Sequence, residues 1–290
     1  MFKTKSKIAL VSTTLIALMV LVGCGQTAAP TPETKTPAPT ATTIDKKTIS
    51  AAGSTAIQPL VKLAAEEFMA KNPGVQVNIS GGGSMTGINN VASGAIEIGN
   101  SDVLAPDSVT GLVDHEVCVA PFLLITNKDV TVDNLTKAQA TDIFTGKVTN
   151  WKDVGGQDQK ISIIGRAASS GTRLNVEKIV MDGKKMTDAA AAQDSTGNLL
   201  TGVAQTPGAI GYIDSAYLKD TVKALKFEGV EYSADAVTSG KYPIYSYEHM
   251  YTKGEATGTV KLFLDYIMSP EFQDKNVEKS GFIPSNKMKK

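Results

Sequence analysis

The spacing of hydrophobic residues in the first third of the chain predicts strands that alternate with helices. Apolar and polar residues alternate in the predicted strands, whereas the predicted helices repeat their apolar residues with a helical period. The predicted elements are, in order, a strand at Thr48–Ala52, a helix at Pro59–Lys71, a strand at Val75–Ile79, a helix at Gly87–Ser93 and a strand at Ala95–Ile98. This order predicts a parallel sheet with ligand-binding groups at the carboxyl ends of its strands.

The remainder of the chain shows the same mixture of patterns and ends in helices. Thr136 followed by Gln139 has the spacing of a capping box, which predicts a helix that begins there and ends near Gly146. Further strands are predicted at Ile161–Ile164, Gly208–Ile213 and Val222–Phe227, and further helices at Leu174–Met181, Gly258–Met268 and Pro270–Lys279. The chain is therefore predicted to have an α/β fold.

Two long segments differ from the rest because they are extended and apolar or aromatic. They are Val117–Thr126 and Tyr242–Tyr247. If both link the same two lobes, one lobe comprises residues 47–122 and 244–290, the other comprises residues 123–243, and a ligand cleft lies between them. The alternative is a single larger sheet with long loops.

The N-terminal segment, residues 1–23, has the pattern of a secretory signal. Three lysines among the first seven residues precede an apolar run at residues 8–22, which is short for a membrane span. Cys24 follows Leu21-Val-Gly where cleavage is expected, so the segment resembles a lipoprotein signal in which Cys24 is acylated. The alternative is an ordinary signal peptide that happens to contain a cysteine.

Residues 24–46 are rich in Thr, Pro and Ala and show no apolar periodicity. A segment of this composition cannot bury enough apolar surface to offset its loss of conformational entropy. We therefore predict an extended tether. An acylated cysteine followed by a tether predicts a globular body held at the extracytoplasmic face of the bacterial cell membrane.

Charge and cysteine content argue against several kinds of partner. The chain has 29 basic and 29 acidic residues and a formal net charge of zero, whereas nucleic acids and anionic lipids attract basic proteins. With Cys24 acylated, Cys118 has no partner for a disulfide, and its apolar neighbours predict a buried strand residue. His115 and His249 lack the spacing of metal ligands. No nucleic acid, metal or cofactor is expected.

Three short loops rich in Gly, Ser and Thr each follow a strand-like run and precede a helix-like run. They are Gly53–Pro59, Ser80–Gly87 and Arg166–Arg173. A helix start exposes unpaired N–H groups and a partial positive charge, and glycine lets a ligand approach the backbone closely. One such loop is usually only a helix cap. Three of them, one carrying an arginine, predict a site for a small tetrahedral oxyanion.

These loops and several further motifs resemble those of the phosphate-binding lipoproteins of bacterial high-affinity phosphate ABC importers, which have the type II periplasmic-binding-protein fold. The shared motifs are Gly53-Ser-Thr-Ala56, Gly81-Gly-Gly-Ser-Met-Thr-Gly87, Ile98-Gly-Asn-Ser-Asp102, Ile143-Phe-Thr-Gly-Lys-Val-Thr-Asn-Trp-Lys-Asp-Val-Gly-Gly156, Arg166-Ala-Ala-Ser-Ser-Gly-Thr172, Gly208-Ala-Ile-Gly-Tyr212 and Tyr242-Pro-Ile-Tyr245. They occur in order across nearly all of the body, so the resemblance is far more specific than any single loop.

The resemblance implies hinged lobes that bind inorganic phosphate and deliver it to the membrane permease and ATPase subunits of the importer. The ligand-binding residues that it implies are Thr55, Ala56 through its backbone N–H, Ser84, Asp102, Arg166, Ser170, Gly171 and Thr172, with Ser54 and Ser101 as additional donors. Some relatives have an aromatic residue where this chain has Ala56. Because that position contributes a backbone N–H, we expect the contact to survive.

Asp102 is the implied ligand residue that distinguishes phosphate from similar anions. A carboxylate only accepts hydrogen bonds, so it favours an oxyanion that keeps a proton at neutral pH, as phosphate does and sulfate does not. An unpaired buried acceptor facing a like charge should cost several kcal/mol, on the order of 10³-fold in affinity. The alternatives are a helix-capping role for Asp102 and a site for another tetrahedral oxyanion such as sulfate, molybdate or tungstate.

Other functional classes find less support in the sequence. A serine hydrolase or phosphatase is disfavoured because Ser84 and Ser170 lack a Gly-x-Ser-x-Gly motif and neither histidine has a recognisable partner. No Gly-x-x-x-x-Gly-Lys-[Ser/Thr] motif indicates nucleotide chemistry. An adhesive or scaffolding surface lipoprotein would not need three anion-ready loops and an arginine. We therefore predict a binding protein without catalytic residues.

Overall fold

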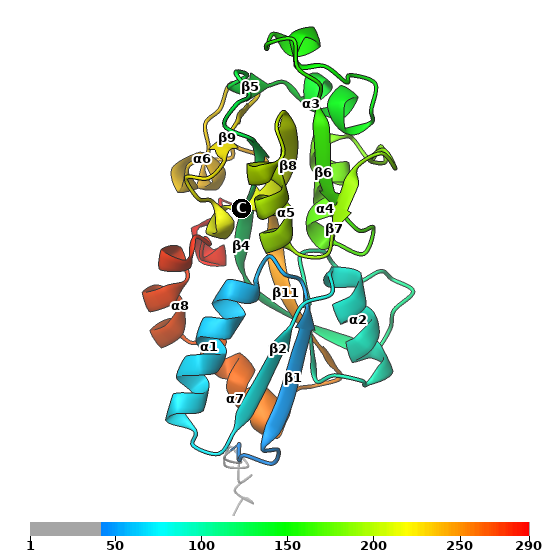
Figure 1. Ribbon diagram of the computed structural model, residues 1–290. Helices are drawn as coiled ribbons and strands as arrows, with labels where there is room; N and C mark the ends of the chain where they lie inside the picture. The colour runs from blue at the N-terminus through cyan, green and yellow to red at the C-terminus, as the bar shows by residue number, and fades with distance from the viewer. Residues whose placement is uncertain (1–41, 290) are drawn as a thin grey trace, which may run out of the picture. The chain divides into compact units, whose positions relative to one another are not determined.

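A nine-stranded mixed sheet organises the computed structural model, which describes residues 42–289 (Figure 1). Eight strands follow the spatial order β2-β1-β3-β11-β4-β8-β6-β7, and β9 pairs with β4 beside this path. The strands are β1 Thr48–Gly53, β2 Gln76–Ser80, β3 Ile98–Ser101, β4 Leu112–Thr126, β6 Ser162–Arg166, β7 Ala191–Gln193, β8 Ala209–Asp214, β9 Lys223–Ala224 and β11 Tyr245–Lys253. A separate pair joins β5 Asn134–Leu135 to β10 Lys226–Phe227. The predicted mixed α/β class is confirmed.

The first three strands form the predicted parallel sheet. β1 lies between β2 and β3 and runs parallel to both. Their carboxyl ends therefore lie at one edge of the sheet, where the chain continues into Ser54, Gly81 and Asp102. Ser54 and Asp102, both predicted to bind the anion, thus follow the neighbouring strands β1 and β3.

One long strand, β4, connects the two halves of the sheet. Its residues Leu112–Pro121 pair antiparallel with β11, and Phe122–Thr126 pair antiparallel with β8. The change of partner falls inside the predicted crossing segment Val117–Thr126. Tyr242–Tyr247 reaches the same point, because Phe122 N donates a hydrogen bond of 2.9 Å to Ile244 O.

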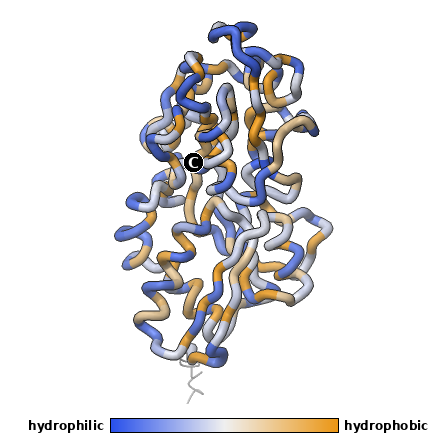
Figure 2. The backbone as a smooth tube through the Cα atoms, viewed as in Figure 1, coloured by the Kyte–Doolittle hydropathy of each residue, from blue (hydrophilic) through white to orange (hydrophobic). Residues whose placement is uncertain are grey.

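Helices cover both faces of the β2-β1-β3 region (Figure 1). The main core contains the buried faces of α1 and α7, whereas α2 packs over a smaller cluster formed by Ile88, Val91 and Tyr251. Figure 2 shows hydrophobic and hydrophilic residues interspersed along α1 and α7, as expected for helices with one buried face. The helices are α1 Gln58–Lys71, α2 Ser84–Ser93, α3 Lys137–Phe144, α4 Gly171–Asn175, α5 Thr196–Gln205, α6 Ala234–Thr238, α7 Gly258–Ile267 and α8 Pro270–Asn276.

The capping box at the start of α3 is confirmed. The Thr136 hydroxyl accepts a hydrogen bond from Gln139 N, and the Gln139 side chain accepts one from Thr136 N. The reciprocal bonds occupy two N–H groups that a helix start leaves unpaired. Here the local sequence alone determines where the helix begins.

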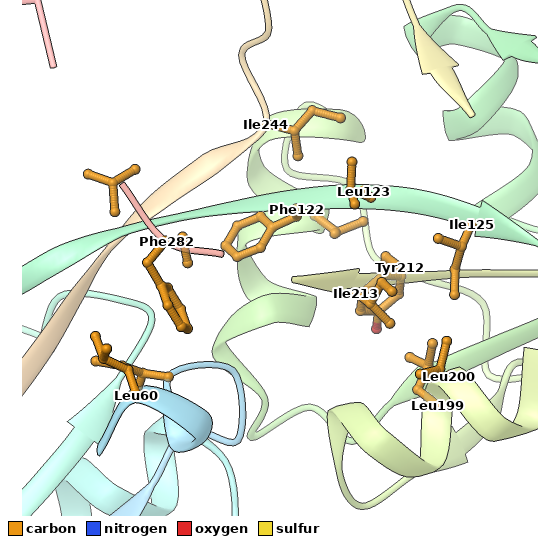
Figure 3. Close-up of a cluster of buried hydrophobic side chains, with 14 of the residues drawn as sticks. Leu60, Phe122, Leu123, Ile125, Leu199, Leu200, Tyr212, Ile213, Ile244 and Phe282 are labelled. Atoms are coloured by element: carbon orange, nitrogen blue, oxygen red, sulfur yellow. The ribbon is translucent and has the colours of Figure 1, made fainter. Parts of the chain in front are cut away.

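The hydrophobic core is continuous across the change of partner on β4 (Figure 3). Phe122 of β4 is fully buried, as are Leu60 of α1 and Leu199 of α5. Figure 3 shows these side chains in one cluster with Phe282, which lies near the end of the chain. Segments from the beginning, middle and end of the chain therefore stabilise the sheet beneath the candidate site.

Several predicted boundaries were wrong. The third strand spans Ile98–Ser101 rather than Ala95–Ile98, because its pairing with β1 runs from Ala51↔Ile98 to Gly53↔Asn100. α2 packs closely on this strand, since a Cβ on Gly99 would lie 2.6 Å from Gly87 O. The apolar run before Ile98 misled the prediction, and the polar motif after it belongs to the strand.

Two further predicted elements are divided in the structure. The predicted helix Leu174–Met181 is a short α4 followed by a π-helical turn at Val176–Val180. The predicted strand Val222–Phe227 is split between β9, which pairs with β4, and β10, which pairs with β5. Leu225 lies between them and donates its N–H to Leu124 O at 2.9 Å.

The predicted signal segment, Cys24 and most of the tether lie outside the described residues. At the end of the predicted tether, Asp45 Oδ1 accepts a hydrogen bond of 2.8 Å from Thr259 N, and Lys46 N donates one of 3.1 Å to Thr259 Oγ1. The last tether residues are thus held at the start of α7. Within residues 42–289, no helix is long and apolar enough to cross a bilayer.

Candidate anion site

The predicted ligand residues share one property, which is burial. The ten residues are Ser54, Thr55, Ala56, Ser84, Ser101, Asp102, Arg166, Ser170, Gly171 and Thr172, and all are buried. They come from the carboxyl ends of β1, β3 and β6 and from the starts of α2 and α4. The hydrogen bonds that these residues make, with one another and with neighbours such as Thr196, form two groups, one around Arg166 and the other around Asp102.

Arg166 is the last residue of β6 and is only 4 % exposed. Nε donates to Gln193 O at 3.1 Å, Nη2 donates to Asp194 O at 3.1 Å, and Nη1 donates to Thr196 Oγ1 at 3.2 Å. A guanidinium has five N–H donors, so these bonds leave one N–H on each terminal nitrogen. That remaining pair is the fork with which arginine binds two oxygens of one anion.

Thr55 joins the loop after β1 to the Arg166 group. Its Oγ1 accepts a hydrogen bond of 3.1 Å from Thr196 N and lies 3.0 Å from Thr196 Oγ1. Its carbonyl oxygen accepts a hydrogen bond of 2.6 Å from the Tyr217 hydroxyl. Residues near the two ends of the sheet path therefore meet here through direct contacts.

Asp102 is the centre of the second group. Its Oδ2 accepts a hydrogen bond of 2.9 Å from Thr172 Oγ1, and its backbone N–H donates one of 3.0 Å to Ser84 Oγ. Its carbonyl oxygen accepts one of 2.7 Å from Asn175 Nδ2. The loop after β3 is thereby bound to the starts of α2 and α4.

Gly171 allows this second group to close. A Cβ at this position would lie 2.3 Å from Ser84 Oγ and 2.9 Å from Asp102 Cβ. No side chain fits at that distance, so the start of α4 reaches Ser84 and Asp102 only because residue 171 is glycine.

The hydroxyl groups of the site differ in what they still can donate. Ser54 Oγ accepts from Ala56 N at 3.0 Å, and Ser170 Oγ accepts from Arg173 N at 3.3 Å, so their hydroxyl hydrogens are not consumed by these bonds. Ser101 differs, because its hydroxyl donates to Val103 O at 2.6 Å. The N–H of Ala56, which was expected to face the ligand, points to Ser54 Oγ in this structure.

Both arginines of the chain serve this region. Arg173 Nη1 donates to Arg166 O at 2.9 Å, and Arg173 Nε pairs with Glu177 at 2.9 Å. Although burial by itself raises the pKa of Glu177, hydrogen bonds from Lys185 and Arg173 lower it below its ordinary value. Arg173 thus holds the backbone of Arg166 through its carbonyl oxygen.

Sequence analysis missed Thr196 and Tyr217. Thr196 is buried, begins α5, and contacts both Thr55 and Arg166. A signal for it existed, since Asp194-Ser-Thr-Gly197 is a fourth loop of Ser, Thr and Gly before a helix. No local signal pointed to Tyr217, because only the tertiary structure brings its hydroxyl to Thr55.

Sequence analysis also missed two buried acids next to Asp102. Asp214 ends β8 and Glu248 lies in β11, and both are fully buried. Burial raises the pKa of the Asp214 carboxyl well above its ordinary value, the charge of Asp102 raises it further, and the Arg166 guanidinium opposes both effects. Burial also raises the pKa of Glu248, and the charges of Asp102 and Asp214 add to this effect. Both carboxyls therefore favour their protonated forms.

A cavity of about 480 Å³ adjoins the Asp102 group on the side of β11. Asp102 and Ser246 line it, together with Leu104, Tyr245 and Tyr247. Asp102 is the one predicted ligand residue among its lining residues. The cavity therefore adjoins the Asp102 group, and Arg166 does not line it.

In chemical terms the site offers a buried cationic fork, several hydroxyl groups and one carboxylate acceptor. Among residues 42–289, no group of three or more His, Cys, Asp or Glu side chains is arranged to hold a metal ion. This combination suits an oxyanion that accepts many hydrogen bonds and donates one.

Comparison with known proteins places this geometry in a family. A family model described as a PBP superfamily domain matches residues 33–271. The phosphate-binding protein PstS of Bacillus subtilis is 44 % identical over 246 residues, which cover 83 % of this chain and 82 % of the relative.

Solved structures agree. A candidate phosphate ABC transporter substrate-binding protein of Clostridium perfringens, solved with bound phosphate, has a TM-score of 0.78 and 36 % identity and covers 82 % of this chain and 99 % of its own. An ABC-type phosphate transport receptor of Vibrio cholerae has a TM-score of 0.68 and 27 % identity, with coverage of 81 % and 99 %.

The close contact at Gly171 yields a prediction about stability. Gly171→Ala should lower the free energy of unfolding by about 1–3 kcal/mol, because the added methyl group overlaps Ser84 Oγ in a packed interior. Urea unfolding followed by circular dichroism measures the change.

Gly197→Ala is the matched control, because its added Cβ would meet only Tyr217 Cε1, at 3.9 Å, within helix α5. Equal unfolding free energies for the two variants would mean that Gly171 and Ser84 do not touch in solution.

Proposed function

Because this chain belongs to the PBP superfamily, and within it to the PstS family of phosphate-binding proteins, we propose that it binds inorganic phosphate outside the cytoplasm and delivers it to an ABC-type importer. The observation that carries the proposal is the pairing of two opposite chemistries in one buried site. Arg166 keeps one free N–H on each terminal nitrogen, and Asp102 provides a buried acceptor.

The ligand residues in this proposal are those predicted from sequence except Ala56 and Ser101, whose hydrogens are bonded to Ser54 Oγ and Val103 O, with Thr196 added. The Arg166 fork would bind two phosphate oxygens, and the hydroxyls of Ser84 and Ser170 would donate to the others. Asp102 would accept a hydrogen bond from the ligand's P–OH group. These roles are supported by the burial of the residues and by their contacts across the site.

The alternative is a site for another tetrahedral oxyanion, such as sulfate, molybdate or tungstate. A fully deprotonated ligand has no hydrogen for Asp102, which would leave a buried carboxylate facing a like charge. The presence of Asp102 at the centre of its group therefore favours phosphate.

We also propose that the mature protein is anchored by a lipid on Cys24 and works at the extracytoplasmic face of the cell membrane. The motive is the lipobox-like Leu21-Val-Gly-Cys24 and the Thr- and Pro-rich segment that follows it. Its partners would be the permease and ATPase subunits of the importer. In this proposal the protein binds its ligand and does not catalyse a reaction.

The two-lobe division is a further part of this proposal. Residues 47–122 and 244–290 would form one lobe and residues 123–243 the other, with the hinge where β4 changes partners at Phe122. Five contacts would then join the lobes across the site: Thr55 with Thr196, Thr55 with Tyr217, Asp102 with Thr172, Asp102 with Asn175, and Met85 with Ser169. Such contacts are those of a closed state.

Binding selectivity tests the proposed function. Phosphate should bind the purified protein one to one, arsenate should compete because it is similarly protonated and sized, and sulfate should not compete. Isothermal titration calorimetry measures all three. Sulfate affinity comparable to that of phosphate would contradict the role of Asp102, and release of phosphate from a phosphomonoester would instead indicate an enzyme.

Arg166→Lys tests the fork. A lysine has a single ammonium and cannot bond Gln193 O, Asp194 O and two ligand oxygens together, so phosphate binding should weaken by about 1–3 kcal/mol. The control is Arg173→Lys, the same change at the arginine that faces Glu177, and its effect should be smaller. Unchanged phosphate affinity in Arg166→Lys would remove Arg166 from the set of ligand residues.

Small-angle scattering tests the hinge. A soluble form of the protein that begins near Ile44 should be more compact with phosphate than without it, because the ligand adds contacts to both lobes in the closed state. Scattering profiles that coincide while calorimetry confirms binding would contradict closure on the ligand.

A further inference from the structure

Glu248 lies next to Asp102, on the strand β11 that pairs with β3. β11 runs antiparallel to β3 with His249 opposite Ser101, so the preceding residue of β11, Glu248, faces the position of Asp102. The pairing of β11 with β4 is irregular between Glu248 and His249, and such irregularities re-aim side chains. After burial, the charge of Asp102 and a hydrogen bond with its side chain contribute to the raised pKa of Glu248, so the two carboxyls are neighbours.

The hydrogen bonds of these two carboxyls are incomplete in complementary ways. Glu248 Oε1 accepts a hydrogen bond of 3.0 Å from Ser246 Oγ, and Asp102 Oδ2 accepts one from Thr172. The other two oxygens, Glu248 Oε2 and Asp102 Oδ1, are buried and have no donor among the residues that the structure describes. Two acceptors cannot satisfy each other unless one of them carries a proton.

The proton belongs on Glu248. Glu248 is fully buried opposite Cys118 of β4 with the acids Asp102 and Asp214 as neighbours, whereas Asp102 lines the adjoining cavity and accepts a hydrogen bond from Thr172. Ionising Glu248 would place a second negative charge beside Asp102 in this interior, and an unpaired buried charge is very costly. A protonated Glu248 has one O–H to donate, and the orphaned Asp102 Oδ1 is the acceptor within reach.

We propose that Glu248 is a positioning residue for phosphate recognition, which donates a hydrogen bond from its protonated carboxyl to Oδ1 of Asp102. The bond fixes the plane of the Asp102 carboxylate. Its remaining lone pairs are then held toward the ligand's P–OH group. This inference rests on the proposed function, because it assigns to Glu248 the orientation of the acceptor that reads the ligand's proton.

Two substitutions of Glu248 separate the donor from the shape of the side chain. Glu248→Gln keeps a donor for Asp102 Oδ1 and an acceptor for Ser246, whereas Glu248→Leu keeps neither. We expect Glu248→Leu to lose about tenfold in phosphate affinity and to narrow the ratio of phosphate to sulfate affinity by about the same factor. Glu248→Gln should recover most of both quantities. Calorimetric titration of the full chain in mild detergent with phosphate and with sulfate measures them.

Glu116→Leu and Glu116→Gln are the matched controls, because Glu116 is an exposed acid on β4 that lines the neighbouring cavity. Neither should change the ratio. Thermal unfolding of each variant distinguishes a loss of fold from a loss of recognition, since a purely structural role would lower the melting temperature without changing the ratio. An unchanged ratio in folded Glu248→Leu, or an equal loss in Glu248→Gln, would overturn the proposal.

A spectroscopic measurement covers the case in which Glu248→Leu does not fold. At about pH 8, where a carboxyl in water is ionised, the infrared spectrum of the wild type minus that of Glu248→Gln should show the C=O stretch of a protonated carboxyl. The wild type minus Glu116→Gln should not show it. Absence of the band in the first difference would overturn the proposal. Failure of the wild type itself to bind phosphate would instead refute the proposed function and leave the infrared result to judge the proton on Glu248.

Discussion

The guanidinium of Arg166 must stay buried and hydrogen-bonded, and the rest of the site depends on this requirement. A buried cation is tolerated only where polar groups replace its water. Here the replacements are the carbonyls of Gln193 and Asp194 and the hydroxyl of Thr196. They are available because β7 pairs in parallel with β6 and sets Gln193 opposite Arg166. The same bonds leave the fork free on its outer side.

The carboxyl groups impose a second electrostatic constraint. Asp102, Asp214 and Glu248 are all buried, and the region that they share would also receive a doubly negative ligand. The Arg166 guanidinium is the cation that opposes the raised pKa of Asp214. Protonation reduces the excess negative charge in this interior. Burial and the neighbouring carboxylates raise the pKa values of Asp214 and Glu248 and so favour their protonated forms. A protonated carboxyl can donate a hydrogen bond to Asp102 without neutralising its charge, whereas a lysine or arginine in the same place would neutralise it.

Close packing brings these charged groups together. α2 approaches the sheet through Gly87 and Gly99, and α4 approaches Ser84 and Asp102 through Gly171. The long strand β4 carries the chain from one half of the sheet to the other, and its core residues pack on both sides of the change of partner. Thr55 and Thr196 lie on opposite sides of the proposed hinge at Phe122, so opening of that hinge would separate them.

Local sequence was sufficient for the features that depend on local physics. The parallel order of the first three strands, the capping box at Thr136 and the mixed α/β class follow from periodicity and helix-start chemistry, and the structure confirms them. The loops at Ser54, Ser84 and Arg166 were recognisable because three Ser/Thr/Gly loops between strand and helix indicate an anion site, whereas a single one is usually only a helix cap. Most of the residues predicted to bind the ligand came from these loops, and the structure buries all of them, although their binding roles stay predictions.

The tertiary structure decided what depends on neighbours distant in the sequence. β3 extends to Ser101 because β1 pairs with it, although the apolar run that suggested a strand ends at Ile98. Thr196 and Tyr217 reach Thr55 across more than a hundred residues, and no pattern within their own segments records that contact. Glu248 reads in sequence as one acid in an aromatic strand. Its proton and its place behind Asp102 arise only when β11 inserts between β3 and β4, because burial and the charge of a neighbour are properties of the folded chain.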